Sequence, residues 1–273
     1  MQLINWYPGH IAKAQKKLKD NIKLVDLVIE MVDSRLPISS HFGCVDELLN
    51  NKDKLILLNK SDLTDKTKID ESIDYWKNKE TEAISISSIN PKDVLKVRNS
   101  LKKYHDKLTE KLAKRGVLPR SLRVMVIGLP NIGKSTLINR IVDKKKVKTG
   151  DKPGVTRTSQ WVRIGENIEL LDTPGIIIPK FEDQIFAIKL VMIGSISTES
   201  YEPIETSREI IKYLKENDHE FLNKFGEDFS IEVYGKTRNF IKSGNQIDID
   251  RSAKTFIKDL RDGKLITLFL DKF

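Results

Sequence analysis

One segment of the chain has the residue types and spacing that bind nucleotide phosphates. GLPNIGKST (128–136) fits the pattern G-x-x-x-x-G-K-[S/T] and lies between the apolar run RVMVIG and the helix-forming stretch STLINRIV. A glycine-rich turn between a strand and a helix places backbone N–H groups around phosphate oxygens. A chance glycine turn is disfavoured in this context. The expected phosphate-binding set is Asn131, Ile132, Gly133, Lys134, Ser135 and Thr136.

Two side chains of this loop have distinct expected roles in chemistry on the phosphates. The Lys134 ammonium can reach the β- and γ-phosphates, so Lys134 is a candidate catalytic residue as well as a binding one. The Ser135 hydroxyl is a candidate Mg²⁺ ligand. The segment therefore predicts a nucleoside triphosphate and Mg²⁺ at one site.

Downstream residues could complete the magnesium site and sense the terminal phosphate. DTPG (172–175) follows the apolar run IELL, so Asp172 is expected at a strand end, where it can hold Mg²⁺ through water. The Gly175 N–H can contact the γ-phosphate. KPGVTRT (152–158) lies between the two motifs, and Thr156 is its candidate metal ligand and catalytic residue. Without these neighbours, Thr156 would be an ordinary loop residue.

An earlier segment predicts which base is bound. NKSD (59–62) ends the apolar run KLILL. Asn59 can bond the base and brace the phosphate loop, and the stem of Lys60 can lie along the base plane. The Asp62 carboxylate can accept hydrogen bonds from guanine N1 and N2, donors that adenine lacks, so an ATP-dependent enzyme is disfavoured. The short pattern is weak alone and strong beside a phosphate loop.

The guanine site is expected to extend to the end of the next strand. SSI (87–89) lies where a Ser-Ala-Lys type loop would support the base, although Ile89 departs from that pattern. Guanine recognition thus precedes the phosphate loop by about 70 residues, the reverse of the order in Ras-like GTPases. Circular permutation preserves such a site, because domain termini often lie close together. The expected guanine-binding set is Asn59, Lys60, Ser61, Asp62, Ser87 and Ser88.

The elements that must position these residues alternate along the chain. Six apolar, β-branched runs are expected strands: Leu27–Val32, Lys54–Leu58, Ala83–Ser87, Leu122–Ile127, Gln160–Ile164 and Ile168–Leu171. Five amphipathic stretches are expected helices: 9–23, 43–51, 68–79, 91–115 and 134–142. This alternation favours an α/β fold with a mostly parallel sheet between helices. We therefore expect a circularly permuted Ras-like P-loop GTPase domain over residues 1–180.

The pattern becomes helical after about residue 180. The expected helices are 183–194, 204–217, 231–242 and 251–262, with Asp250 as the N-cap and Gly263 as the stop signal of the last. Residues 181–273 are expected to form a small, mainly α-helical domain. This domain is slightly acidic, with 14 Lys and Arg against 17 Asp and Glu.

Charge and composition limit the class of protein. The net charge is +9, and 18 Lys and Arg against 5 Asp and Glu lie between residues 92 and 152. Such a basic segment favours a polyanion such as nucleic acid, and a solvated lysine-rich helix is an equal alternative. No apolar run approaches the roughly 20 residues of a membrane span, and no signal peptide is evident. The single Cys44 excludes a disulfide framework and fits a buried or incidental thiol better than a catalytic one.

The permuted order and several short motifs resemble one family. NWYPGHIAKAQ (5–15), VDSRLP (32–37), NKSD, GLPNIGKST, PGVTR and LLDTPGI are similar to the YlqF/RbgA group, the ribosome biogenesis GTPase A family. The resemblance covers residues 5 to about 190 and continues more weakly through GKTRNFIKSGNQID (235–248). The related RsgA-like and YqeH-like groups carry zinc modules, so a chain with one cysteine is disfavoured as a member of either.

The resemblance implies a cytoplasmic GTPase that binds GTP and GDP and acts late in assembly of the large ribosomal subunit. We expect a monomer without membrane contact. The C-terminal domain resembles an ANTAR-like RNA-binding module. The implied rRNA-facing surfaces are the basic helix 91–115 and the stretch 236–242, with Lys236, Arg238 and Lys242 as contact candidates.

The resemblance also bears on the mechanism. Ras-like proteins orient the attacking water with a glutamine after D-x-x-G, but this chain has Ile176 there. His10 matches the family histidine proposed for this task. An imidazole suits the task because it can exchange a proton with water near neutral pH. The alternative is a structural His that caps the first helix. Asn131 matches the asparagine that supports K⁺ in cation-dependent GTPases, or only stabilises the loop.

A different class of function stays open. The chain could be a nucleotide-gated RNA-binding module whose hydrolysis is incidental. Turnover measured with and without large-subunit particles separates this class from a particle-stimulated GTPase.

Overall fold

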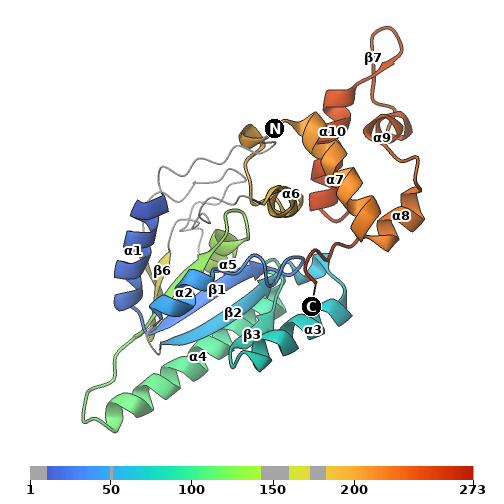
Figure 1. Cartoon of the computed structure of the whole chain (residues 1–273). Helices are drawn as coiled ribbons and strands as arrows, with labels where there is room; N and C mark the ends of the chain where they lie inside the picture. The colour runs from blue at the N-terminus through green and yellow to red at the C-terminus, as the bar shows by residue number, and fades with distance from the viewer. Residues whose placement is uncertain (1–10, 50–51, 143–159, 173–182, 273) are drawn as a thin grey trace. The chain divides into compact units, whose positions relative to one another are not determined.

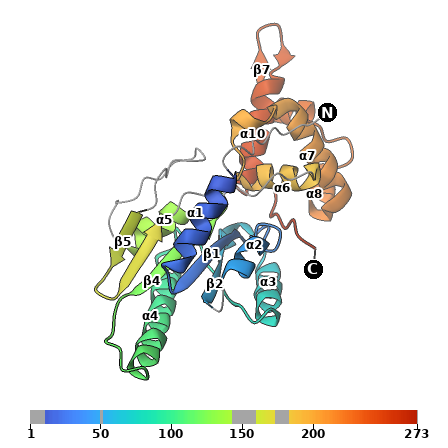
Figure 2. The ribbon, with the colours of Figure 1, turned by 60° about the vertical axis from the view of Figure 1, so that its left-hand side comes forward.

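A six-stranded sheet forms the centre of the first part of the chain. The computed structural model describes residues 11–49, 52–142, 160–172 and 183–272 (Figure 1). The strand order is β3-β2-β1-β4-β6-β5, and all neighbours are parallel except β5 and β6. Figure 2 shows β5 at one margin of the sheet. The strands are β1 (Leu27–Asp33), β2 (Asp53–Asn59), β3 (Glu82–Ser85), β4 (Leu122–Gly128), β5 (Gln160–Ile164) and β6 (Ile168–Asp172).

The six expected strands are confirmed. The longest apolar runs form strands inside the sheet, where both faces of a strand can be covered. Every residue of β1 is buried, and the last five residues of β2 are buried as well. β1 contains two carboxyl residues, Glu30 in its middle and Asp33 at its end. Glu30 accepts a hydrogen bond from the Phe42 backbone N–H at 2.7 Å and lies 2.8 Å from His41 Nδ1. The strand can therefore hold a charged residue in its interior, because polar partners surround it.

Helices flank the sheet in the first part of the chain. They are α1 (Ile11–Lys23), α2 (Gly43–Leu48), α3 (Lys66–Asn78), α4 (Pro91–Ala113) and α5 (Lys134–Ile141), with a short 3₁₀ turn, η1 (Ser61–Leu63). The Asn90 side chain caps α4 by accepting a hydrogen bond from Lys92 N at 3.0 Å, and Pro91 occupies the first turn. None of the described helices is both long and apolar enough to cross a membrane.

The strand order matches the permutation expected from the motifs. β4 and α5 flank the phosphate loop, and β1 pairs with β4 in the middle of the sheet. Reading from β4 through β6 and then from β1 to β3 gives a Ras-like GTPase domain whose sequence begins at a different strand. The parallel ends of β1, β2 and β4 therefore meet at one edge of the sheet.

Helices dominate the second part of the chain. They are α6 (Gln184–Ile193), α7 (Pro203–Asn217), α8 (His219–Phe225), α9 (Ile231–Thr237) and α10 (Ile249–Arg261), with a 3₁₀ turn, η2 (Thr198–Ser200), and a two-stranded hairpin, β7 (Ile241–Lys242) and β8 (Gln246–Ile247). Phe221, Phe229 and Phe256 pack in its core. Residues 183–268 form one compact unit, and residues 11–172 together with 269–272 form the other.

Two sequence expectations for this unit are wrong. The helix expected over 231–242 ends at Thr237, because Asn239 takes a left-handed backbone conformation and the following residues form the hairpin. Gly244 and Asn245, both left-handed, form its turn. The N-cap of α10 is Asp248 rather than Asp250, because its carboxylate accepts a hydrogen bond from Arg251 N at 3.1 Å.

The last described residues of the chain pack on the sheet unit. Leu270 N donates to Arg35 O at 2.7 Å. One carboxylate oxygen of Asp271 accepts hydrogen bonds from Ile38 N at 2.6 Å and Ser39 N at 3.0 Å. The segment 33–41, which follows β1, is therefore tied to the C-terminal end of the chain.

Candidate nucleotide-binding site

The phosphate loop needs glycine at its two ends. Gly128 ends β4 with φ +151°, and a Cβ there would lie 2.5 Å from Met31 O. Gly133 begins α5 with φ +104°, and a Cβ there would lie 2.4 Å from Asn59 Nδ2. Both φ values lie in the region that favours glycine. Between them Asn131 is left-handed at φ +57°. The glycine spacing of the motif therefore follows from close approach of β1 and of the guanine motif.

Asn59 joins the guanine motif to the phosphate loop. Its Nδ2 donates to Ile132 O at 2.5 Å, and its Oδ1 accepts hydrogen bonds from Ser88 N at 2.9 Å and from Ser88 Oγ at 2.8 Å. The Asn59 residue is only 2% exposed. One side chain thus connects the ends of β2 and β3 to a loop 73 residues further along the chain.

Lys134 is held inside the loop that it is expected to serve. Its Nζ donates to Leu129 O at 2.8 Å and to Gly128 O at 3.2 Å, and the residue is buried. A buried ammonium bonded to neutral carbonyls is well placed to pair with an anion. Ser135 and Thr136 follow in the first turn of α5, where helix N–H groups have no intrahelical acceptor.

The guanine side of the site is partly open. Ser61 N donates to Ile86 O at 3.1 Å, which fixes η1 against the end of β3. Asp62 is exposed, and its contact with guanine stays a prediction. Ser87 N donates to Asp93 Oδ2 at 3.0 Å. Burial by itself raises the pKa of Asp93, but hydrogen bonds from Lys96 and from the Ser87 backbone lower it more, so this support stays ionised.

The donor set at the sheet edge fits Mg²⁺, which prefers oxygen ligands. Ser135 offers a hydroxyl at the start of α5. Asp172 is the last residue of β6, where its backbone pairs in register with Val126 of β4, two residues before the phosphate loop begins. Its side chain lies outside the described residues, as do His10, Thr156 and Gly175.

The RNA-contact candidates belong to the helical unit. Lys236 is exposed at the end of α9. Arg238 pairs with Asp259, and Lys242 Nζ lies 3.3 Å from Asp248 Oδ1 in the hairpin. Arg238 and Lys242 are therefore near carboxylates, and the contact of all three cations with RNA stays a prediction.

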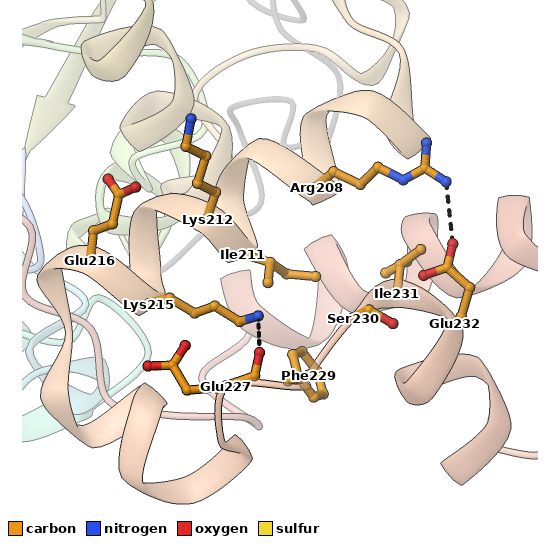
Figure 3. A pocket seen from close by; sticks show the side chains of 10 residues that line it. All are labelled: Arg208, Ile211, Lys212, Lys215, Glu216, Glu227, Phe229, Ser230, Ile231 and Glu232. Carbon is orange, nitrogen blue, oxygen red and sulfur yellow. Dashed lines mark hydrogen bonds and ion pairs between the residues drawn. The ribbon is translucent and has the colours of Figure 1, made fainter.

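The helical unit also has an open groove of about 500 Å³, shown in Figure 3. Arg208 and Lys215 of α7 line one side, and Arg208 Nη2 lies 3.2 Å from Glu232 Oε1 on the other. Lys215 donates to the Glu227 backbone carbonyl. The residues that line this groove include none of the nucleotide motifs, so it is not the site that the motifs predict.

Sequence reasoning missed Asp33 and Arg35 as residues of this edge. Asp33 pairs in register with Asn59, and its carboxylate Oδ2 lies 3.1 Å from Lys60 Nζ. The run VDSRLP contributed to the family resemblance without a role for these two residues. The signal was an ionisable residue at the end of the strand that neighbours the guanine motif.

The fold and the geometry of the phosphate loop define a P-loop GTPase domain in circularly permuted order. Residues 123–224 match the sequence family described as 50S ribosome-binding GTPase. The chain is 37% identical over 272 residues to ribosome biogenesis GTPase A of Bacillus cereus, covering 96% of this chain and 92% of that protein. It is 32% identical to the protein of the same name from Thermotoga maritima, covering 96% and 91%.

A solved structure agrees with these relatives. The crystal structure of GNP-bound YlqF from T. maritima has a TM-score of 0.67 to this chain at 26% identity, covering 95% of this chain and 98% of that one. The chain therefore belongs to the ribosome biogenesis GTPase A family. It is a GTPase of ribosome biogenesis, and its family generally uses Mg²⁺.

Proposed function

We propose that this chain binds the large ribosomal subunit, hydrolyses GTP there and promotes late maturation of the particle. The observation that carries the proposal is the match to a family described as 50S ribosome-binding, combined with full-length relatives named for ribosome biogenesis. We also propose that the protein is cytoplasmic and monomeric.

The proposed roles combine the sequence motifs with the contacts of the described residues. Asn59 holds the guanine motif against the phosphate loop, and Asp62 reads the guanine edge. When nucleotide binds, the Lys134 ammonium replaces its hydrogen bonds to loop carbonyls with contacts to the β- and γ-phosphates. It then stabilises the charge that develops on these phosphates. Ser135, Thr156 and Asp172 hold Mg²⁺, which when bound neutralises phosphate charge.

The attacking water needs a partner other than the usual glutamine. We assign this role to His10, whose imidazole can orient water and accept a proton near neutral pH. Asn131 is the proposed support for K⁺, which when bound would supply positive charge beside the phosphates. His10→Ala should keep GTP affinity within a few-fold and lower particle-stimulated turnover by roughly 10²-fold, the usual worth of a positioned acid–base group.

The proposed RNA surface is centred on α4. Lys102, Lys103 and Lys111 are exposed, whereas Lys96 and Lys107 have carboxylate neighbours at 2.7 Å and 2.8 Å. Cations that neutralise phosphates release counterions, so their contribution depends on salt. The exposed α4 lysines are therefore the expected source of salt-dependent affinity, with Lys236, Arg238 and Lys242 as the contacts of the helical unit.

Co-sedimentation with isolated large ribosomal subunits tests this surface. The variant Lys103→Glu with Lys111→Glu should bind more weakly and reduce the slope of log affinity against log salt by about 2, one for each lost phosphate contact. The matched control is Lys66→Glu with Lys77→Glu on α3, which makes the same change of charge on exposed lysines. Equal losses in both variants would mean that net charge, and not α4, governs binding.

A further inference from the structure

Asp33 lies where the guanine motif can use it. It ends β1, and parallel pairing places it beside Asn59 at the end of β2. Ser34 N donates to Asn59 O at 2.8 Å, so the backbones stay joined beyond the strands. Asp33 is completely buried, and a buried carboxylate requires partners.

Two cations surround the Asp33 carboxylate. Arg35 Nε donates to Oδ1 at 2.8 Å, and Arg35 Nη2 donates to Oδ2 at 2.9 Å, which makes a two-point fork. Arg35 N adds a third hydrogen bond, to Oδ1 at 3.1 Å. Lys60 Nζ lies 3.1 Å from Oδ2. Burial alone would raise the pKa of Asp33, but the charges of Arg35 and Lys60 and the hydrogen bonds from Arg35 hold it well below its usual value.

The Arg35 fork already satisfies both carboxylate oxygens, so Lys60 is an additional partner. Lys60 has a left-handed backbone, at φ +59°, a conformation that is unfavourable for a non-glycine residue. Its side chain remains 24% exposed although its ammonium reaches a fully buried carboxylate. The Lys60 side chain therefore runs from solvent to an ammonium that is anchored at Asp33.

We propose that Asp33 is a positioning residue for guanine recognition, which acts by anchoring the Lys60 ammonium so that the lysine stem is preordered beside the base. The proposal rests on the guanine site proposed above. A free lysine has several rotatable bonds, and ordering it when nucleotide binds costs affinity. An ammonium anchored before binding removes part of that cost.

The surrounding segment keeps Asp33 in place. Asp33 N donates to Ser40 Oγ at 3.3 Å. The same segment is held by Asp271, which accepts hydrogen bonds from Ile38 N and Ser39 N. Asp259 of the helical unit is also a buried aspartate whose carboxylate is paired with an arginine, Arg238, and it has no part in the proposed guanine site, which makes it a matched control.

A double-mutant cycle on GDP affinity tests the proposal with the full-length protein and a fluorescent GDP. Asp33→Asn and Lys60→Met should each weaken GDP by about 5- to 10-fold, the usual cost of immobilising a long side chain. In the Lys60→Met background, Asp33→Asn should change affinity by less than about 2-fold, because its effect passes through Lys60. Asp259→Asn should leave affinity within about 2-fold of the wild type.

The outcomes separate this inference from the guanine site itself. An equal loss from Asp33→Asn in both backgrounds, or no loss in the wild-type background, overturns the inference. If Asp33→Asn does not fold, Lys60→Arg replaces it: binding within about 3-fold of wild type supports the anchor, and binding as weak as Lys60→Met refutes it. If Asp62→Asn leaves guanine preference unchanged, the guanine site proposed above is wrong, and the role of Asp33 is not what has failed.

Discussion

Removing the Asn59 side chain should both destabilise the GTPase unit and weaken nucleotide binding. Asn59→Ala deletes three hydrogen bonds, one to Ile132 O and two from Ser88. A net hydrogen bond contributes about 1 kcal/mol, and a buried group left without a partner costs about 1 to 3 kcal/mol. Because Asn59 is buried, we expect a loss of about 2–4 kcal/mol in the free energy of unfolding.

Urea unfolding and GDP titration measure the two effects separately. A loss of this size leaves most domains folded, since their total stability is about 5–15 kcal/mol. Without its brace at Ile132 the phosphate loop should bind GDP about 10- to 100-fold more weakly, which corresponds to about 1.4–2.8 kcal/mol. Asn78→Ala is the control, because Asn78 is exposed near the end of α3, and should shift stability by less than about 0.5 kcal/mol.

Wild-type stability together with wild-type GDP affinity in Asn59→Ala would refute this reasoning. A loss of stability without a loss of affinity would limit Asn59 to packing. Ser88→Ala should give an intermediate result, because it removes only one of the three hydrogen bonds.

Three further predictions concern other residues. Asp62→Asn should shift preference from guanine to xanthine nucleotides in a competition assay; unchanged preference would contradict its assignment. Lys134→Ala should abolish most Mg²⁺-dependent nucleotide binding, and an unchanged titration curve would exclude Lys134 from the phosphate site. In the helical unit, burial raises the pKa of Asp259, but hydrogen bonds from groups including Tyr234 lower it below its unfolded value. The ionised Asp259 carboxylate therefore stabilises the folded unit above its unfolded pKa, and this stabilisation is lost as pH falls through the folded pKa. Asp259→Asn should therefore reduce the fall in the free energy of unfolding at acid pH, measured by urea unfolding. Asp250→Asn, which changes an exposed carboxylate, should not.

Sequence predicts the sheet and the phosphate loop because their signals are local. Six apolar runs specify six strands, and the glycine spacing of GLPNIGKST follows from steric limits at Gly128 and Gly133. The contact of Asn59 with the phosphate loop was predictable as well, since the motif type implies it. The six strands agree with the expected runs to within two residues at each end.

Long-range contacts and weak local signals explain what sequence did not predict. Asp271 reaches Ile38 across 233 positions, and no periodic pattern marks such a pair. The seven-residue α8 depends on the Asp218 cap and on burial of Phe221, both of which need the tertiary fold. Asp33 was overlooked because its partner Lys60 becomes adjacent only when β1 and β2 pair.

GTP turnover with and without isolated large ribosomal subunits decides whether the particle activates this GTPase. We expect turnover to rise by roughly 10²-fold when particles are added, the usual worth of one positioned acid–base group. The rise should be lost in Lys134→Ala and reduced in Lys103→Glu with Lys111→Glu at physiological salt. Turnover that is the same with and without particles, while the protein still binds them, would contradict the account and favour a nucleotide-gated RNA-binding module.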